Sequence, residues 1–392
     1  MSMYRFQRRY RVLSAAVLAI SGTSAFLPNL LSAQSSFAQS GQTANGSGAV
    51  FIMSNNADKN EVIAFDRGGD GSLTEAHRYD TGGRGSGGVT DPLESQGSLT
   101  LSHDHSLLFA VNAGSGTVSV FKVLRSNLAL IDKEPSGGSQ PVAVAQWNNL
   151  VYVLNSGGPG SVVGFRLAGG GQLQPIANST AFLTANTTAG ASLSFSPDGQ
   201  FLLVTERLAN TIDAFHVQPD GTLSPIVVNQ NPAPGTFSVA FAPNGKAIVS
   251  ETGPAGASNA SATSSYSVGP DGKLTAVSQS VAALAAGNCW NAITPDGTRV
   301  YVSNSGSDSI SGYNIAKDGT LTPIGQTVVG NNPPGSHNVD IAVSSDGKFV
   351  YTINSDSGNI GIFRIENDGT LTSLGQAGDL AKMSGFNGIA AI

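Results

Sequence analysis

The chain has 392 residues, of which 40% are hydrophobic and only 12% are charged. A hydrophobic share of this size supports a sizeable core and excludes a chain that is disordered throughout. Glycine accounts for 49 residues, well above the roughly 7% of an average protein. Abundant glycine with few charges favours short strands and tight turns, and it excludes a helical bundle or coiled coil. The net charge of −6 leaves no basic stripe, which excludes a nucleic-acid-binding module.

The first 38 residues have the pattern of a secretory signal peptide. Four arginines and no acid lie within residues 1–11, an apolar run follows from residue 12 to about 27, and small residues lead up to Ala38. We therefore predict cleavage after Ala38, a flexible segment over residues 39–47 and export of the mature chain, to the periplasm or as a secreted protein. No later segment is long and apolar enough to cross a bilayer, so no membrane span is expected after cleavage.

A phrase of about fifty residues repeats along the rest of the chain. Each copy has an apolar strand that ends in Asn or Glu, a small polar turn, a second strand and the sequence Asp-Gly-x-Leu; Val300–Leu321 and Val350–Leu371 are the clearest copies. The polar residues that end the first strands are Asn55, Asn112, Asn155, Glu206, Glu251, Asn304 and Asn354. Their spacings of 57, 43, 51, 45, 53 and 50 residues leave no room for a second domain, so residues 48–392 are predicted to form one.

Asp-Gly or Asn-Gly pairs recur twice in each complete repeat and predict hairpins of type I′. Two hairpins per repeat join four antiparallel strands as a meander. Four-stranded units repeated at this period predict an all-β fold, the seven-bladed β-propeller, rather than a solenoid, whose repeats are shorter.

The two ends of the repeat array predict how the ring closes. A further strand, such as Asn338–Val343, precedes the strand pair in each later repeat, but the first repeat opens directly at Val50. The last residues, Asn387–Ile392, match this missing element. We therefore predict that the C-terminal strand completes the first blade and leaves no exposed sheet edge there.

Two motifs, Ser196–Val204 and Thr294–Asn304, resemble the seven-bladed lactonase family, which includes 6-phosphogluconolactonase and 3-carboxymuconate cyclase. The resemblance extends from about residue 48 to the end. An exported bacterial branch of the family is resembled in three further segments, Thr205–Phe215, Asn288–Trp290 and Phe386–Ala390. It implies a lactone hydrolase or cycloisomerase.

The family's site residues are only partly matched. The resemblance implies a site with one His, two Arg and one Glu near the starts and ends of neighbouring strands. The positions of the His and the two Arg fall on Ala191, Phe237 and Ser305, and only the Glu has a counterpart, Glu251. The chain therefore lacks the guanidinium and imidazole groups that would polarise a carbonyl and activate water.

Three residues remain as catalytic candidates in a rewired site. Glu251 is the candidate general base, Glu206 is a second carboxylate in the adjacent repeat, and Arg207 is a candidate electrophile. The residues themselves leave open whether the chain is an enzyme. No cofactor and no metal is expected, since no nucleotide-binding or metal-binding motif is present.

The propeller geometry predicts a ligand-binding rim around the axial funnel. The ends of the first strands and the starts of the preceding strands gather on one face; the candidate ligand-binding residues there are Asn304, Asn354, Asn288, Asn338, His337 and Trp290. Neutral amides suit a hydroxyl-bearing or amide-bearing ligand better than a phosphorylated one. The alternative is that the Asn side chains brace the loops at strand ends.

Two further motifs are predicted to be structural. Cys289 is the single cysteine, which excludes an intramolecular disulfide and predicts a buried, inert thiol. The sequence His103-Asp104-His105 resembles a metal-binding cluster, but it occupies the Pro-Asp-Gly position of other repeats and is predicted to be a turn on the opposite face.

Two functional hypotheses follow. The first is an exported, monomeric, lactonase-like propeller that acts on or binds a small polar ligand, such as a lactone, in its funnel. The alternative is a non-catalytic binding or scaffold propeller that recognises a polysaccharide, a peptide or a protein partner of the cell envelope or exterior.

Overall fold

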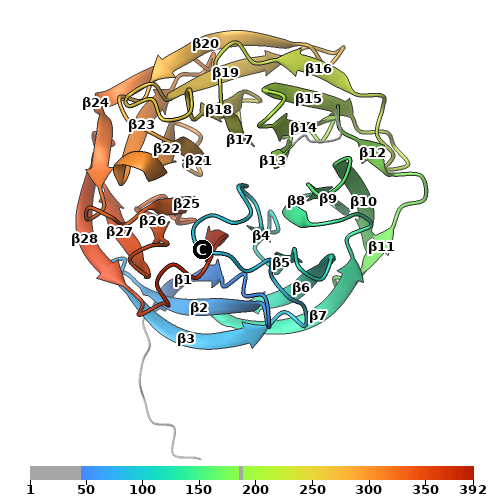
Figure 1. Ribbon diagram of the computed structural model, residues 1–392, viewed down its shortest axis with the longest axis horizontal. Coiled ribbons are helices and arrows are strands. Elements are labelled where there is room, and N and C mark those ends of the chain that lie inside the picture. The colour runs from blue at the N-terminus through green and yellow to red at the C-terminus, as the bar shows by residue number, and fades with distance from the viewer. Residues whose placement is uncertain (1–45, 185–188) are drawn as a thin grey trace, which may run out of the picture. The chain divides into compact units, whose positions relative to one another are not determined.

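The computed structural model describes residues 46–184 and 189–392, which form a ring of seven antiparallel β-sheets (Figure 1). The predicted signal peptide over residues 1–38 lies outside the described residues, as do residues 39–45. Strand β1 begins at Gly46, at the end of the predicted flexible segment.

The blades follow one another around the ring, and the strands of each blade are named from the centre outward. Blade 1 contains β29 (Ile389–Ala391), β1 (Gly46–Met53), β2 (Glu61–Gly68) and β3 (Leu73–Asp80). Blade 2 contains β4 (Leu99–Leu101), β5 (Leu107–Asn112), β6 (Thr117–Leu124) and β7 (Asn127–Pro135). Blade 3 contains β8 (Pro141–Trp147), β9 (Leu150–Asn155) and β10 (Ser161–Leu167), with the outer position divided between β11 (Leu173–Pro175) and β12 (Ala181–Phe182).

The remaining four blades repeat the same order. Blade 4 contains β13 (Gly190–Phe195), β14 (Phe201–Glu206), β15 (Thr211–His216) and β16 (Val227–Gln230). Blade 5 contains β17 (Thr236–Phe241), β18 (Ala247–Glu251), β19 (Ala262–Val268) and β20 (Leu274–Ala282). Blade 6 contains β21 (Asn288–Ile293), β22 (Arg299–Asn304), β23 (Ser309–Ile315) and β24 (Leu321–Asn331). Blade 7 contains β25 (Asn338–Val343), β26 (Phe349–Asn354), β27 (Asn359–Ile365) and β28 (Leu371–Ala377).

Burial falls from the second strand to the outer strand of a blade. Every residue of β26 is buried, because this strand is covered on both faces by neighbouring blades, whereas most of β28 is exposed. The 3-10 helix η1 (Ser305–Ser307) follows β22. No helix within the described part of the chain is long and apolar enough to cross a membrane.

The turns between the first and second strands of blades 2, 4, 6 and 7 share one hydrogen-bond pattern. In blade 4 the Ser196 hydroxyl donates to Asp198 Oδ1 at 2.6 Å, the same oxygen accepts from the backbone N–H of Gln200, and Gly199 has φ of 70°. Only the glycine has a positive φ, so the predicted type I′ geometry is wrong for this turn. The Asp side chain instead accepts the hydrogen bonds that close a longer turn.

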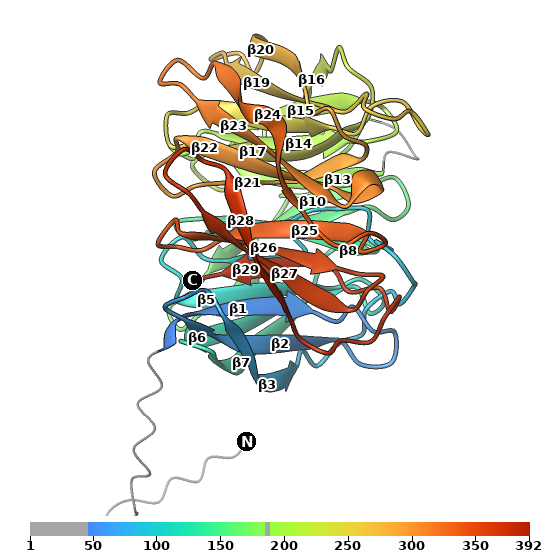
Figure 2. The ribbon, with the colours of Figure 1, turned by 90° about the vertical axis from the view of Figure 1, so that its left-hand side faces the viewer.

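The C-terminal strand closes the ring, as predicted. β29 pairs with β1 in antiparallel register (Figure 2). Phe51 lies opposite Ala390, and the backbone N–H of Ala49 donates to the main-chain oxygen of Ile392 at 3.1 Å. The buried Arg67 side chain also donates to that oxygen, at 3.0 Å. The first strand of the blade therefore comes from the opposite end of the chain.

Truncating a side chain of this closing strand should destabilise the whole ring. Ile389→Ala removes a side chain that is only 6% exposed, so we expect the free energy of unfolding to fall by about 2–4 kcal/mol in urea denaturation. Leu374→Ala in the outer strand β28, where the side chain is 39% exposed, is the control and should cost less than about 1 kcal/mol. Equal losses in the two variants would contradict a special role for closure.

Candidate functional site

The ring has two faces that differ in their loops. On one face, which we call the anchor face, lie the last residues of the second strands, which are the first apolar strands of the sequence repeats. These residues are Asn112, Asn155, Glu206, Glu251, Asn304 and Asn354. The turns between first and second strands, such as Ser196–Gln200, lie on the other, which we call the turn face. The predicted gathering of strand ends on one face is therefore present.

A segment that sequence analysis missed occupies the centre of the ring. Residues 91–98, which we call the axial segment, precede β4 and run into the middle of the propeller (Figure 1). The backbone N–H of Gln96 donates to the carbonyl of Ala191 in blade 4, and the Ser95 hydroxyl donates to the carbonyl of Val142 in blade 3. The Ser98 hydroxyl donates to Asn387 Oδ1, just before β29.

The Gln96 side chain extends these bonds across the axis. Its Nε2 donates to the carbonyl oxygen of Asn291 at 2.7 Å, and its Oε1 accepts from the backbone N–H of Asn291 at 3.1 Å. Its Nε2 also lies 3.4 Å from Asp340 Oδ1. Asp340 is buried in blade 7, and burial raises the pKa of its carboxyl to about 7. The axial segment thus ties together blades on opposite sides of the ring.

The axial segment fills the place where the family resemblance implies a site. Ala191 and Phe237, at the implied His and Arg positions, are 0% and 3% exposed. Trp290 is 1% exposed, packs edge-to-face against Phe237 and donates its indole N–H to the carbonyl of Ser95 at 2.8 Å. Ser305, at the second Arg position, is half-buried and lies 4.0 Å from Cys289 Sγ.

The two catalytic candidates with carboxylates are fully buried. Glu251 accepts a hydrogen bond from the Ser264 hydroxyl at 2.6 Å, and burial raises the pKa of Glu251. Glu206 accepts from the backbone N–H of Thr184 at 2.8 Å and from the Thr184 hydroxyl at 2.7 Å. Neither residue lines the two cavities described below. Arg207 forms an ion pair with Glu94 of the axial segment.

Glu206 has a partner that sequence analysis also missed. Asp213 on β15 is completely buried, no donor satisfies either of its carboxyl oxygens, and its side chain lies within hydrogen-bond reach of Glu206. Burial and the neighbouring Glu206 both raise the pKa of Asp213. The raised pKa favours the protonated, neutral form of Asp213 beside the buried Glu206.

The amide N–H groups of the asparagines on the anchor face donate to residues of their own blade or of the neighbouring blade. Asn288 donates to Asn304 Oδ1 at 2.8 Å, Asn304 donates to the hydroxyls of Ser309 and Ser311, and Asn354 donates to Asn359 Oδ1. Asn338 donates to the hydroxyl of Ser303 and the carbonyl of Ser309, while His337 is half-buried and its backbone N–H donates to Asp308. The predicted amides are thus brought to one face, where their bonds brace strand ends.

The two motifs predicted to be structural have the expected places. Cys289 is a free, buried thiol whose pKa is raised by burial. His103 and Asp104 lie in a turn of the turn face, where Asp104 Oδ1 accepts from the hydroxyls of Ser102 and Ser106. In the described ranges no group of three His, Cys, Asp or Glu side chains could hold a metal ion.

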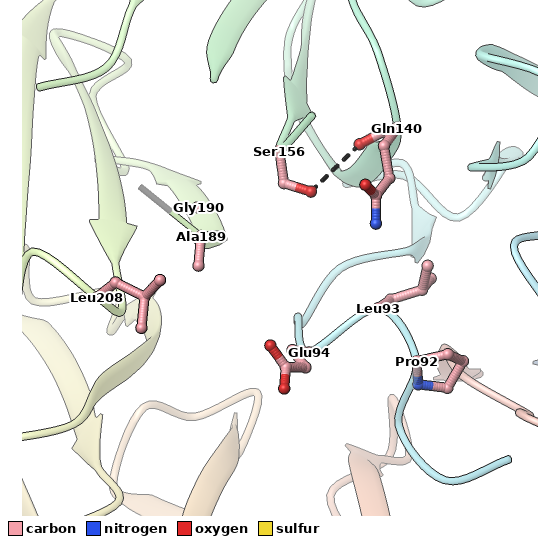
Figure 3. Close-up of a pocket in the computed structure, with 8 residues that line it drawn as sticks. All are labelled: Pro92, Leu93, Glu94, Gln140, Ser156, Ala189, Gly190 and Leu208. Carbon is pink, nitrogen blue, oxygen red and sulfur yellow. Dashed lines mark hydrogen bonds between the residues drawn. The ribbon is translucent and has the colours of Figure 1, made fainter. Parts of the chain in front are cut away.

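A small pocket remains at the anchor face beside the axial segment (Figure 3). Its volume is about 220 Å³, and its lining includes Leu93 and Glu94 of the axial segment, Gln140 and Leu208. The Ser156 hydroxyl lies 3.5 Å from the carbonyl oxygen of Gln140, so this polar pair is already engaged.

A larger cavity lies in the axial channel on the side of the turn face. It has a volume of about 680 Å³, within the usual range of small-molecule sites. It extends from turn residues such as His103 and Asn148 to Gln96 and Asn291, so we call it the axial cavity. Its walls come from the inner strands of blades 2 to 6.

Three aromatic side chains, from blades 3, 4 and 5, line the axial cavity. Trp147, Phe195 and Phe241 line it together with Pro197 and Pro243, and the lining contains no Lys, Arg, Asp or Glu. The Trp147 indole N–H donates to the carbonyl of Pro197 at 3.1 Å, and its ring centroid lies 6.4 Å from that of Phe195. None of these residues was predicted, because the sequence pattern marks only the anchor face. The one available signal was their position at the last residue of a first strand or just after it.

The raised pKa of Asp213 predicts a pH-dependent stability. Because the folded pKa of Asp213 is raised, its contribution is complete below its unfolded pKa of about 4 and is lost as the pH rises through its folded pKa. Asp213→Asn keeps a donor for Glu206 and cannot ionise, so we expect a gain in the free energy of unfolding of about 1–3 kcal/mol at pH 9 that shrinks toward pH 5. Urea denaturation at both pH values measures it, with Asp58→Asn at the surface as control. Parallel pH profiles of Asp213→Asn and the unmodified chain would contradict a raised pKa of Asp213 in the folded state.

Removing the Gln96 amide should loosen the centre of the ring. Gln96→Ala leaves the backbone N–H and carbonyl of Asn291 without partners, so we expect a loss of about 1–3 kcal/mol in the free energy of unfolding. Gln376→Ala on the exposed outer strand is the matched control and should change stability by less than about 0.5 kcal/mol. A neutral Gln96→Ala variant would show that the axial segment is not a structural tie.

Comparisons with known proteins agree with this architecture. Residues 159–289 and 271–383 match the family described as "Lactonase, 7-bladed beta-propeller". A structure from Bacteroides uniformis described as a candidate 6-phosphogluconolactonase is 22% identical, with a TM-score of 0.68, and covers 86% of this chain and 99% of its own. A periplasmic gluconolactonase from Pseudomonas aeruginosa is 18% identical, with a TM-score of 0.63 and the same coverage. No curated protein matches the chain significantly. The chain belongs to the lactonase family of seven-bladed β-propellers.

Proposed function

We propose that this chain is an exported lactonase-family propeller that binds a small uncharged ligand, such as a lactone, in its axial cavity. The observation that carries the proposal is a cavity of about 680 Å³ with aromatic walls on the ring axis. The engaged asparagines and the buried family positions favour this cavity over the anchor face. Because no Lys or Arg lines the cavity, a phosphorylated ligand would be left without a counter-charge.

Tryptophan fluorescence tests the proposal directly, because the chain contains two tryptophans and only Trp147 lines the cavity. Trp290→Phe leaves Trp147 as the reporter. We expect glucono-1,5-lactone, dihydrocoumarin or δ-decalactone to change its emission, with a Kd below about 1 mM, and 6-phosphogluconate to have no effect. Calorimetric titration of the unmodified mature chain provides a second readout that does not depend on the variant.

A cavity-filling variant is the control for the place of binding. Ser194→Trp puts a large side chain into the axial cavity and should weaken binding at least about tenfold, while Ser373→Trp on the exposed outer strand should not. If none of the neutral probes binds the unmodified chain at millimolar concentration, or if both variants bind equally, the axial cavity is not the site.

Family membership also favours lactone opening, and this second candidate needs its own assay. Proton release from the same lactones would be compared for the unmodified chain, Glu251→Gln, Glu206→Gln and the surface control Glu75→Gln. Turnover that is lost in Glu251→Gln alone supports this residue as the general base, and loss in Glu206→Gln as well would add the second carboxylate. Background rates in all four proteins would contradict lactone opening.

A further inference from the structure

We infer that the axial cavity selects a ligand with an apolar ring or alkyl body and a single polar end, rather than a polyhydroxylated sugar. This inference rests on the proposed function and specifies the ligand class of the same site. It differs from the hydroxyl-rich ligand that the asparagine pattern predicted, because those asparagines are engaged elsewhere.

The position of the Trp147 ring is fixed by its contacts. Gly199, with φ of 70°, lies under the Trp147 ring so closely that an added Cβ would come within 2.5 Å of it. The Trp147 indole N–H is held by the carbonyl of Pro197, and Phe195 packs against both Trp147 and Tyr152. Trp147 is therefore a fixed flat surface, with its one donor already used, which suits stacking rather than hydrogen bonding.

Most polar side chains of the cavity are likewise committed to the protein. Gln96 uses both amide atoms on Asn291, and Thr100 donates to the carbonyl of Gly97 at 3.0 Å. Gln146 accepts from the backbone N–H of His103 and donates to the carbonyl of Asn148. A sugar in this cavity would find few partners for its hydroxyls, and each unpaired hydroxyl opposes binding.

Few polar groups of the cavity are still available to a ligand. Ser194, which is half-buried on the inner strand β13, and His103, which is exposed, both line the cavity. Asn291 Oδ1 is a buried acceptor without a partner at the inner end. A ligand with one carbonyl or hydroxyl end could bond to one of these groups while its apolar body contacts Trp147 and Phe241.

Competition among neutral lactones tests this selectivity in Trp290→Phe and, by calorimetry, in the unmodified mature chain. We expect dihydrocoumarin and δ-decalactone to bind at least about tenfold more tightly than glucono-1,5-lactone, because each buries apolar surface and leaves fewer hydroxyls unpaired. Calorimetry should show that Trp147→Ala weakens the binding of dihydrocoumarin about tenfold or more and that Trp147→Phe recovers part of that loss. Ser194→Ala should weaken the binding of dihydrocoumarin and of δ-decalactone about threefold to tenfold.

The outcomes separate this inference from the proposed function. Preferential binding of glucono-1,5-lactone at the cavity would overturn the ligand class but keep the axial cavity as the site. Binding of the apolar lactones that is unaffected by Trp147→Ala and Ser194→Trp would overturn both. Apolar selectivity that depends on Trp147 supports both.

Discussion

The hydrogen bonds of Gln96 at the ring axis are the interaction on which the rest of this structure depends. A propeller of seven separate sheets leaves an open channel at its centre. In this chain the side-chain amide of Gln96 pairs with the backbone of Asn291, and the backbone N–H of Gln96 donates to the carbonyl of Ala191. An amide is well suited to this place because it supplies both a donor and an acceptor without a buried charge. The same pairing blocks the anchor-face funnel and forms the inner end of the axial cavity, so stability and the location of the site have one origin.

Neighbouring blades are joined by contacts that recur around the ring. Tyr152, Tyr301 and Tyr351, each in a second strand, donate their hydroxyls to the turn carbonyls of Gly221, Gly369 and Gly71 in the next blade. Each buried tyrosine thereby satisfies its polar end while its ring fills the space between sheets. The bond from Tyr351 joins the last blade to the first, so the closing boundary is held in the same way as the others.

The fold could be predicted because every repeat has the same pattern of apolar strands and turns. The inner strand that the first repeat lacks has one clear match, in the last residues of the chain. The site did not follow so readily. Register shifts at the starts of the inner strands, for example between Asn288 and Trp290, reverse which side chains face the channel, and periodicity alone does not reveal them. The longest spacing between strand ends, from Asn55 to Asn112, does mark the extra chain length of the axial segment. Its path depends on bonds to distant blades, which no local pattern encodes.

The closing strand has a consequence for the timing of folding. The first blade combines β1, β2 and β3 with β29, so it stays incomplete until residues 389–391 have been made. Pairing across so long a sequence separation is slow compared with the local hairpins of the other blades. A nascent chain would therefore carry an unsealed first blade, open to chaperones, until its last three-residue strand arrives. Closure therefore waits until all the repeats between β1 and β29 have been made.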